Sequence, residues 1–134
     1  MSHFTTVKTK INDLVCLKRA LKDLDIAFTE ASQEQKAFVK GYQGDSTQAQ
    51  MSIHISKTYD VGVKVDEQGN VEFVADWWGV ETTRGWDQEE FQKKVTKRYS
   101  YHKVMQEVAN KGYTLESEEV QEDQTIQVRV RTWR

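Results

Sequence analysis

Three of the four tryptophans lie within ten residues, where they form the chain's densest group of side chains suited to binding. Trp77, Trp78 and Trp86 fall between Asp76 and Asp87, in a segment that also holds two glycines. Adjacent side chains on extended backbone point to opposite sides, so Trp77 and Trp78 cannot both face one core. We therefore expect residues 75–87 to form a contact loop in which one tryptophan is exposed.

Basic side chains form two further candidate surfaces. One is a patch on the outer side of the second predicted helix, made by Lys93, Lys94, Lys97 and Arg98, with Arg84 near its start. The other is one face of the last predicted strand. Arg and Trp dominate the energetics of many interfaces, although a solvated charged face is the alternative for both sets. The predicted partner-binding residues are Trp77, Trp78, Arg84, Arg129, Arg131 and Trp133.

The histidines and the single cysteine do not form a recognisable catalytic or metal-binding pattern. His3, His54 and His102 are too far apart in sequence for a metal-ligand motif. We expect His54 to be solvated on the polar face of a strand and His102 to be half-buried and hydrogen-bonded. Cys16 lies in mid-helix without a nearby base, which is typical of an inert thiol. The sequence therefore predicts no catalytic residue, no metal site and no cofactor.

Sequence motifs for nucleotide binding or nucleophilic catalysis are also missing from the chain. Asp76, Glu81 and Asp87 lie beside tryptophans, as in some sugar-binding sites, but one short loop seldom places two carboxylates across a sugar. An enzyme or small-ligand-binding protein that uses the tryptophan segment as a pocket wall remains the second hypothesis. Whether the chain is an enzyme is thus open, with the balance against it.

Composition limits the classes of partner. The 134 residues include 19 Lys and Arg against 21 Asp and Glu, for a net charge of −2, which argues against DNA binding. An RNA-binding module on the terminal Arg–Trp strand is a third hypothesis, disfavoured by the same balance. No run of ~18 apolar residues predicts a membrane span. A single cysteine and a start without a signal pattern predict a reducing compartment and no export.

Two helices are expected from apolar spacing. The first has Asn12 or Asp13 as its N-cap and a stripe of four leucines, residues 14, 17, 21 and 24, from which Cys16 is displaced. The second begins at Asp87, with Glu90 three residues later in a capping box, and ends before Gly112.

Alternating apolar residues predict strands through most of the remaining chain. The clearest are residues 48–55, then 61–65 and 71–75 joined by a turn at 66–70, and a terminal hairpin of residues 113–119 and 125–133. We predict a single domain, residues 1–134, of class α+β, with a mainly antiparallel sheet and two long amphipathic helices packed on one face. The opposite face would then be exposed or covered by a partner.

Several segments resemble the hypothetical chloroplast frame thirty-five (Ycf) family of cyanobacteria and algal plastids. They are residues 1–9 with the leucines of 14–24, the Ala-Asp-Trp-Trp-Gly of 75–79, and residues 98–104. The family has no established activity, so the resemblance implies no catalytic residues. It implies a plastid stroma or cyanobacterial cytoplasm and an accessory role near photosynthesis. The leading hypothesis is a non-catalytic interaction or accessory protein with a protein partner, such as an assembly or regulatory helper linked to photosynthesis.

Overall fold

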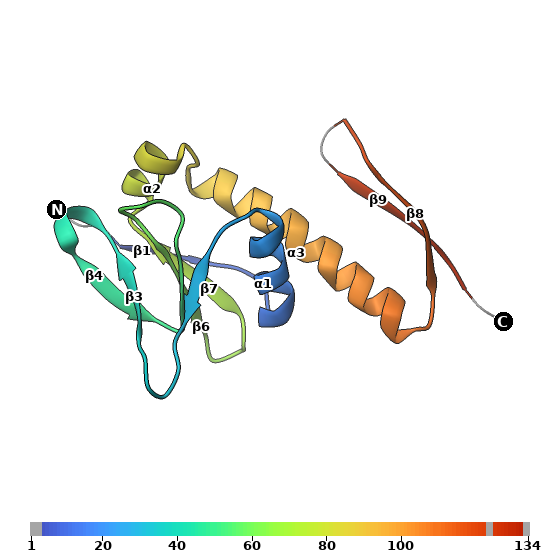
Figure 1. Ribbon diagram of the computed structural model, residues 1–134, viewed down its shortest axis with the longest axis horizontal. Coiled ribbons are helices and arrows are strands. Elements are labelled where there is room, and N and C mark those ends of the chain that lie inside the picture. Colours follow the sequence, from blue (N-terminus) through green and yellow to red (C-terminus); the bar gives the residue numbers. More distant parts are fainter. Residues whose placement is uncertain (1–3, 123–124, 133–134) are drawn as a thin grey trace.

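A computed structural model describes residues 4–122 and 125–132 (Figure 1). Its strands are β1 (Thr5–Lys8), β2 (Phe28–Glu30), β3 (Ala37–Lys40), β4 (Ser46–Ala49), β5 (Met51–Ile53), β6 (Val61–Val65), β7 (Val71–Ala75), β8 (Thr114–Val120) and β9 (Ile126–Arg131). Its α-helices are α1 (Leu14–Asp23), α2 (Trp77–Arg84) and α3 (Gln88–Asn110), and a short 3-10 helix spans Tyr42–Gly44.

The main sheet has five strands in the order β1-β7-β6-β5-β2, and every neighbouring pair is antiparallel. The predicted β6–β7 hairpin is confirmed. In its turn, the Asp66 side chain accepts hydrogen bonds from the backbone N–H groups of Gln68 and Asn70 at 2.9 and 2.8 Å. Gly69 between them has a φ of +86°, which a residue with a Cβ rarely adopts.

Helices α1 and α3 both pack on one face of this sheet, which confirms the predicted fold class. Alternate residues of β6 and β7, such as Val63 and Phe73, share one buried cluster with Leu17 of α1 and Phe91 of α3. The rings of Phe73 and Phe91 meet edge to face with centroids 5.1 Å apart. This cluster is the hydrophobic core.

Both predicted helix starts are confirmed. The Asp13 side chain accepts the backbone N–H of Cys16 at 3.1 Å, and Asp87 accepts that of Glu90 at 2.8 Å. These bonds satisfy backbone donors that a helix leaves unpaired at its N-terminus. At the other end of α3, Gly112 has the positive φ of +71° expected after a helix terminus.

The prediction for the buried face of α1 was wrong in detail. Cys16 is completely buried together with Leu17, Ala20 and Leu21, whereas Leu14 is 38% exposed. Residues at positions i, i+1, i+4 and i+5 form one compact helical face. The small side chains of Cys16 and Ala20 thus share the face on which α1 packs, and Leu14 lies at the exposed first turn.

The second sheet face is not left uncovered, contrary to the simplest expectation. The predicted strand 48–55 is interrupted at Gln50, so that β4 pairs with β3 in a separate two-stranded sheet while β5 joins the main sheet. Val39 of β3 packs so closely on β6 that a Cβ at Gly62 would clash with it. The β3–β4 sheet therefore covers part of this face.

The terminal hairpin forms, but outside the main sheet. Strands β8 and β9 pair only with each other among the described residues, from Thr114 opposite Arg131 to Val120 opposite Ile126. Figure 1 shows this hairpin beside the C-terminal half of α3, at the opposite end of that helix from α2. The terminal hairpin therefore does not extend the five-stranded main sheet.

Candidate functional site

The tryptophan segment is largely helical, so its prediction as an extended loop was wrong. Asp76, predicted as a loop acid, caps α2 by accepting the Gly79 N–H at 3.3 Å. Successive residues of a helix are ~100° apart, so the two indoles still diverge. Trp77 is half-buried and donates its Nε1–H to the carbonyl of Thr5 at 3.1 Å, whereas Trp78 is 62% exposed. One tryptophan is exposed as expected, but through helical geometry.

Helix α2 is attached to the body by aromatic contacts. The Trp77 ring lies 5.6 Å from that of Phe91 in α3. A Cβ at position 79 would collide with the ring of Tyr59, so only glycine fits after the tryptophan pair. Trp78 has one aromatic neighbour, the edge of Tyr42 at 6.3 Å. Its exposure leaves it available to a partner.

Arg84 is part of the junction between α2 and α3. Its guanidinium lies 4.4 Å from the ring centroid of Trp86, and Lys94 approaches the same ring at 5.3 Å. Cation–π contacts of this kind contribute about 0.5–1 kcal/mol at exposed sites. Trp86, expected as a hydrophobic staple, is partly buried against the core. Arg84 therefore has a packing role that the sequence did not indicate.

The arginines of the last strand face an acidic neighbour. Arg129 and Arg131 are exposed on β9, and Arg131 approaches Glu116 of β8 at 3.9 Å with both side chains well exposed. Such a pair is worth little in stability, but glutamates beside the arginines weaken an RNA-binding surface. Trp133, predicted on the same face, lies outside the described residues. Figure 1 places α2 and this hairpin at opposite ends of α3, so the predicted residues do not form one site.

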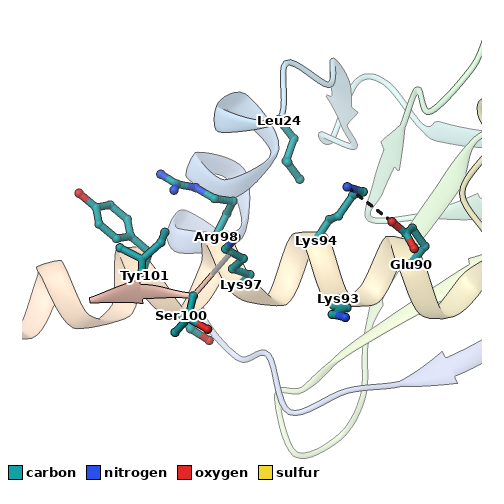
Figure 2. A pocket seen from close by; sticks show the side chains of 10 residues that line it. Leu24, Glu90, Lys93, Lys94, Lys97, Arg98, Ser100 and Tyr101 are labelled. Atoms are coloured by element: carbon teal, nitrogen blue, oxygen red, sulfur yellow. Dashed lines mark ion pairs between the residues drawn. The ribbon is translucent and has the colours of Figure 1, made fainter. Parts of the chain in front are cut away.

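The basic patch of α3 forms one wall of a groove closed by the terminal hairpin. Figure 2 shows these side chains along α3, with Leu24 extending toward them from the end of α1. The groove has a volume of about 620 Å³. It is lined by Leu24, Glu90, Lys93, Lys94, Lys97, Arg98, Ser100, Tyr101, Thr125 and Ile126. Spacings of three and four residues place the α3 members on neighbouring turns of the helix.

Two of the four cations in the groove are already paired. Lys94 lies 3.6 Å from Glu90 one turn earlier, and Arg98 binds Asp23 at 2.7 Å. Lys93 and Lys97 form no ion pair with any residue of 4–122 or 125–132. The groove thus retains uncompensated positive charge beside apolar surface.

Tyr101 connects the two walls of the groove. Arg98 stacks on its ring at 4.6 Å, and its hydroxyl donates to Glu118 of β8 at 2.6 Å. Donation to Glu118, together with burial, raises the pKa of Tyr101, because both favour the neutral phenol. The neutral hydroxyl therefore holds the hairpin against α3. Neither Tyr101 nor Ile126 was predicted; the spacing of Tyr101 from Lys97 was the available signal.

The two described histidines differ in how well they were predicted. His102 is half-buried, as expected, and its Nε2 lies 2.6 Å from Asp23. His54 was expected to be solvated but is hydrogen-bonded to Thr29 and to the buried Asp60.

No group of three or more potential metal ligands occurs within the described part of the chain. None of the described helices is long and apolar enough to cross a membrane.

Comparison with known proteins matches this sequence to a family. The model of a family described as "Protein of unknown function (DUF1257)" matches residues 20–129, from α1 to β9. Proteins named "Uncharacterized protein ycf35" are similar over nearly the whole of both chains. The one from Guillardia theta is 32% identical over 100% of this chain and 99% of its own length. Those from Cyanophora paradoxa and Pyropia yezoensis are 29% and 27% identical, with at least 98% of each chain covered.

No solved structure matches the chain. The matched residues include the end of α1, the whole of α3 and β8, and most of β9. The sequence resemblance is thereby confirmed, and the chain belongs to the DUF1257 family, which includes the ycf35 proteins.

Proposed function

We propose that this protein is an interaction protein whose groove between α3 and the β8–β9 hairpin binds an acidic segment of a partner protein. The observation that carries the proposal is the pair of uncompensated lysines, Lys93 and Lys97, on the groove wall. Carboxylates of a partner could pair with them while its apolar side chains pack on Leu24 and Ile126.

A protein segment suits this groove better than a nucleic acid. A nucleic-acid backbone requires a long cationic track, and binding strength follows the number of phosphates neutralised. Here two lysines are uncompensated, and the neighbouring strand β8 carries Glu116, Glu118 and Glu119. A short acidic segment requires only a few cations and avoids these glutamates. The exposed Trp78 belongs to α2, which lies at the other end of α3 from the hairpin, and would serve as a second, separate contact.

The similarity to ycf35 proteins supports the cellular setting that we propose. A plastid stroma or a cyanobacterial cytoplasm would provide complexes that need accessory factors, and we place this protein among helpers linked to photosynthesis.

The second candidate function is binding of a small anion. The groove volume of about 620 Å³ lies within the ~300–1,000 Å³ range of ligand pockets.

Charge reversal in the groove tests the proposal. A fluorescent peptide of alternating glutamate and leucine would be titrated against wild type and against the Lys93→Glu/Lys97→Glu double variant. We expect the Kd to rise at least about tenfold, because attraction becomes repulsion inside the groove. Free glutamate and inorganic phosphate, added as competitors, distinguish peptide binding from small-anion binding.

The matched control is Lys8→Glu/Lys36→Glu, which changes the net charge equally at two exposed lysines outside the groove. Its Kd should stay within about twofold of wild type at moderate salt, where distant charges are screened. Equal weakening by both double variants would mean that only net charge matters, and the groove would not be the site.

A further inference from the structure

Thr29, His54 and Asp60 form a continuous hydroxyl–imidazole–carboxylate chain on the sheet face opposite α1 and α3. Thr29 Oγ1 lies 2.7 Å from Nε2 of His54, and Nδ1 of the same ring lies 3.0 Å from Oδ1 of Asp60. Ile53 and Ile55 flank His54 and belong to the helix-covered core, so alternation places His54 on the other face. The three residues come from separate segments that the fold brings together.

Asp60 is firmly fixed. Its side chain is 1% exposed, and its Oδ2 accepts the backbone N–H of Lys40 at 2.8 Å. The backbone N–H of Asp60 in turn donates to the carbonyl of Lys40 at 3.0 Å. This clamp aims Oδ1 at the imidazole, and a carboxylate there accepts the Nδ1 proton of His54. The Nε2 lone pair is then directed at the Thr29 hydroxyl, which donates to it.

The hydroxyl lies beside an accessible sheet edge. Strand β2 is the last strand of the main sheet, and the His54 side chain is 37% exposed. Ala31 N–H donates to the Gln50 carbonyl, so the alternation of antiparallel pairing directs the N–H of Glu30 away from β5. The residue after Thr29 thus offers a backbone donor at the open edge. Backbone donors near a nucleophile can stabilise developing negative charge on oxygen.

We propose that Thr29 is a nucleophile that accepts acyl groups from activated esters or thioesters, with His54 as its base and Asp60 as a positioning residue. The Oγ1–carbonyl carbon bond forms as the bond from that carbon to the leaving oxygen or sulfur breaks. The Oγ1 proton passes to His54 Nε2 and then to the leaving group. The product is acyl-Thr29, which water can later hydrolyse through the same base.

This inference is independent of the proposed function, because the Thr29–His54–Asp60 chain shares no residue with the groove lining. The structure also provides an internal reference. Ser52 lies directly opposite Thr29 across β2 and β5, and its Oγ is buried without a hydrogen-bond partner among the described residues. It lacks the base that Thr29 has, so it should not react.

The test uses p-nitrophenyl acetate with the intact protein. We expect p-nitrophenolate release together with one acetyl group, located on Thr29 and absent from Ser52 by peptide mass spectrometry. Thr29→Val removes the hydroxyl and should abolish acetylation at position 29. His54→Gln should slow it at least about tenfold, as loss of a general base does. Thr29→Ser should retain it. Circular dichroism verifies that each variant is folded.

Acetylation confined to lysines, or unchanged labelling kinetics in folded His54→Gln protein, would overturn the proposal. The Thr29–His54–Asp60 chain would then be a structural link between β2, the residue after β5 and the segment before β6. Asp60→Asn is not decisive, because a change at so buried a position can unfold the protein. His54 and Thr29 are more accessible, and their variants decide the outcome.

Discussion

At the scale of single residues, Asp23 connects three parts of the proposed groove. One carboxylate oxygen, Oδ2, accepts Nε and Nη2 of Arg98 at 2.9 and 2.7 Å and lies 2.6 Å from His102 Nε2. Arg98 then stacks on Tyr101, which binds Glu118 of the hairpin. The end of α1 is thereby linked through α3 to β8. Loss of the Asp23 carboxylate should therefore loosen the contact of α1 with α3 and, through Arg98, the contact of α3 with β8.

The same carboxylate predicts how stability depends on pH. Burial alone would raise the pKa of Asp23, but hydrogen bonds from Arg98 and His102 outweigh it and hold the pKa below its ordinary value of 3.8. A lowered folded-state pKa stabilises the protein at pH values above the unfolded pKa and ceases to do so as pH falls through the folded value. The contribution should therefore be complete at about pH 5.5 and should be lost progressively as pH falls below about 4.

Denaturant unfolding of wild type and Asp23→Asn from about pH 5.5 to about pH 2.5 checks this. Wild type should be the more stable at the upper end, and the difference should shrink toward the lower end. A difference that stays constant with pH would show that the Asp23 charge does not contribute. Asp45→Asn, a change at an exposed aspartate without a side-chain partner among the described ion pairs, is the control.

At the scale of elements, α2 separates the roles of two adjacent tryptophans. Trp77→Ala removes the bond to Thr5 and the packing on Phe91, and should cost about 3 kcal/mol of unfolding free energy. Trp78→Ala removes an exposed ring and should cost less than about 1 kcal/mol. Thermal and denaturant melts compare the two. Equal losses would mean that Trp78 also stabilises the monomer and is not reserved for a contact.

Local signals in the sequence predicted the elements that depend on local physics. The caps Asp13 and Asp87 and the β6–β7 turn follow from side-chain bonds to nearby backbone, so residue types suffice to find them. Helix α2 was missed because two aromatics and a glycine are weak helix formers. Its conformation is supported by contacts with Phe91 and Tyr59, which lie outside α2 in the sequence.

Residues brought together by tertiary structure were only partly predictable. The lysines of α3 were identified as a basic patch, but alternation in β8 and β9 does not say where the hairpin lies. The groove therefore could not be predicted. The Thr29–His54–Asp60 chain spans three segments whose register decides the contacts, so no linear motif announces it.

At the scale of the whole molecule, one core supports two separate surfaces, the groove beside α3 and the exposed Trp78 of α2. The core cluster runs from Ile11 through the sheet to Tyr99, and we infer a single domain from its continuity. The β8–β9 hairpin stands outside this cluster and is held by contacts to α3. A two-stranded hairpin has marginal stability by itself, so its position can adjust to a partner at modest cost. The groove thus lies between a helix that belongs to the core and a hairpin that stands outside it.

The most direct test of the groove is to map where an acidic peptide binds. Backbone amide chemical shifts of ¹⁵N-labelled protein would be recorded during titration with the alternating glutamate–leucine peptide. We predict that the largest changes fall in residues 93–101 of α3 and in 125–126 at the start of β9. Largest changes in α2 around Trp78, or changes scattered over all exposed lysines, would contradict the groove as the contact surface.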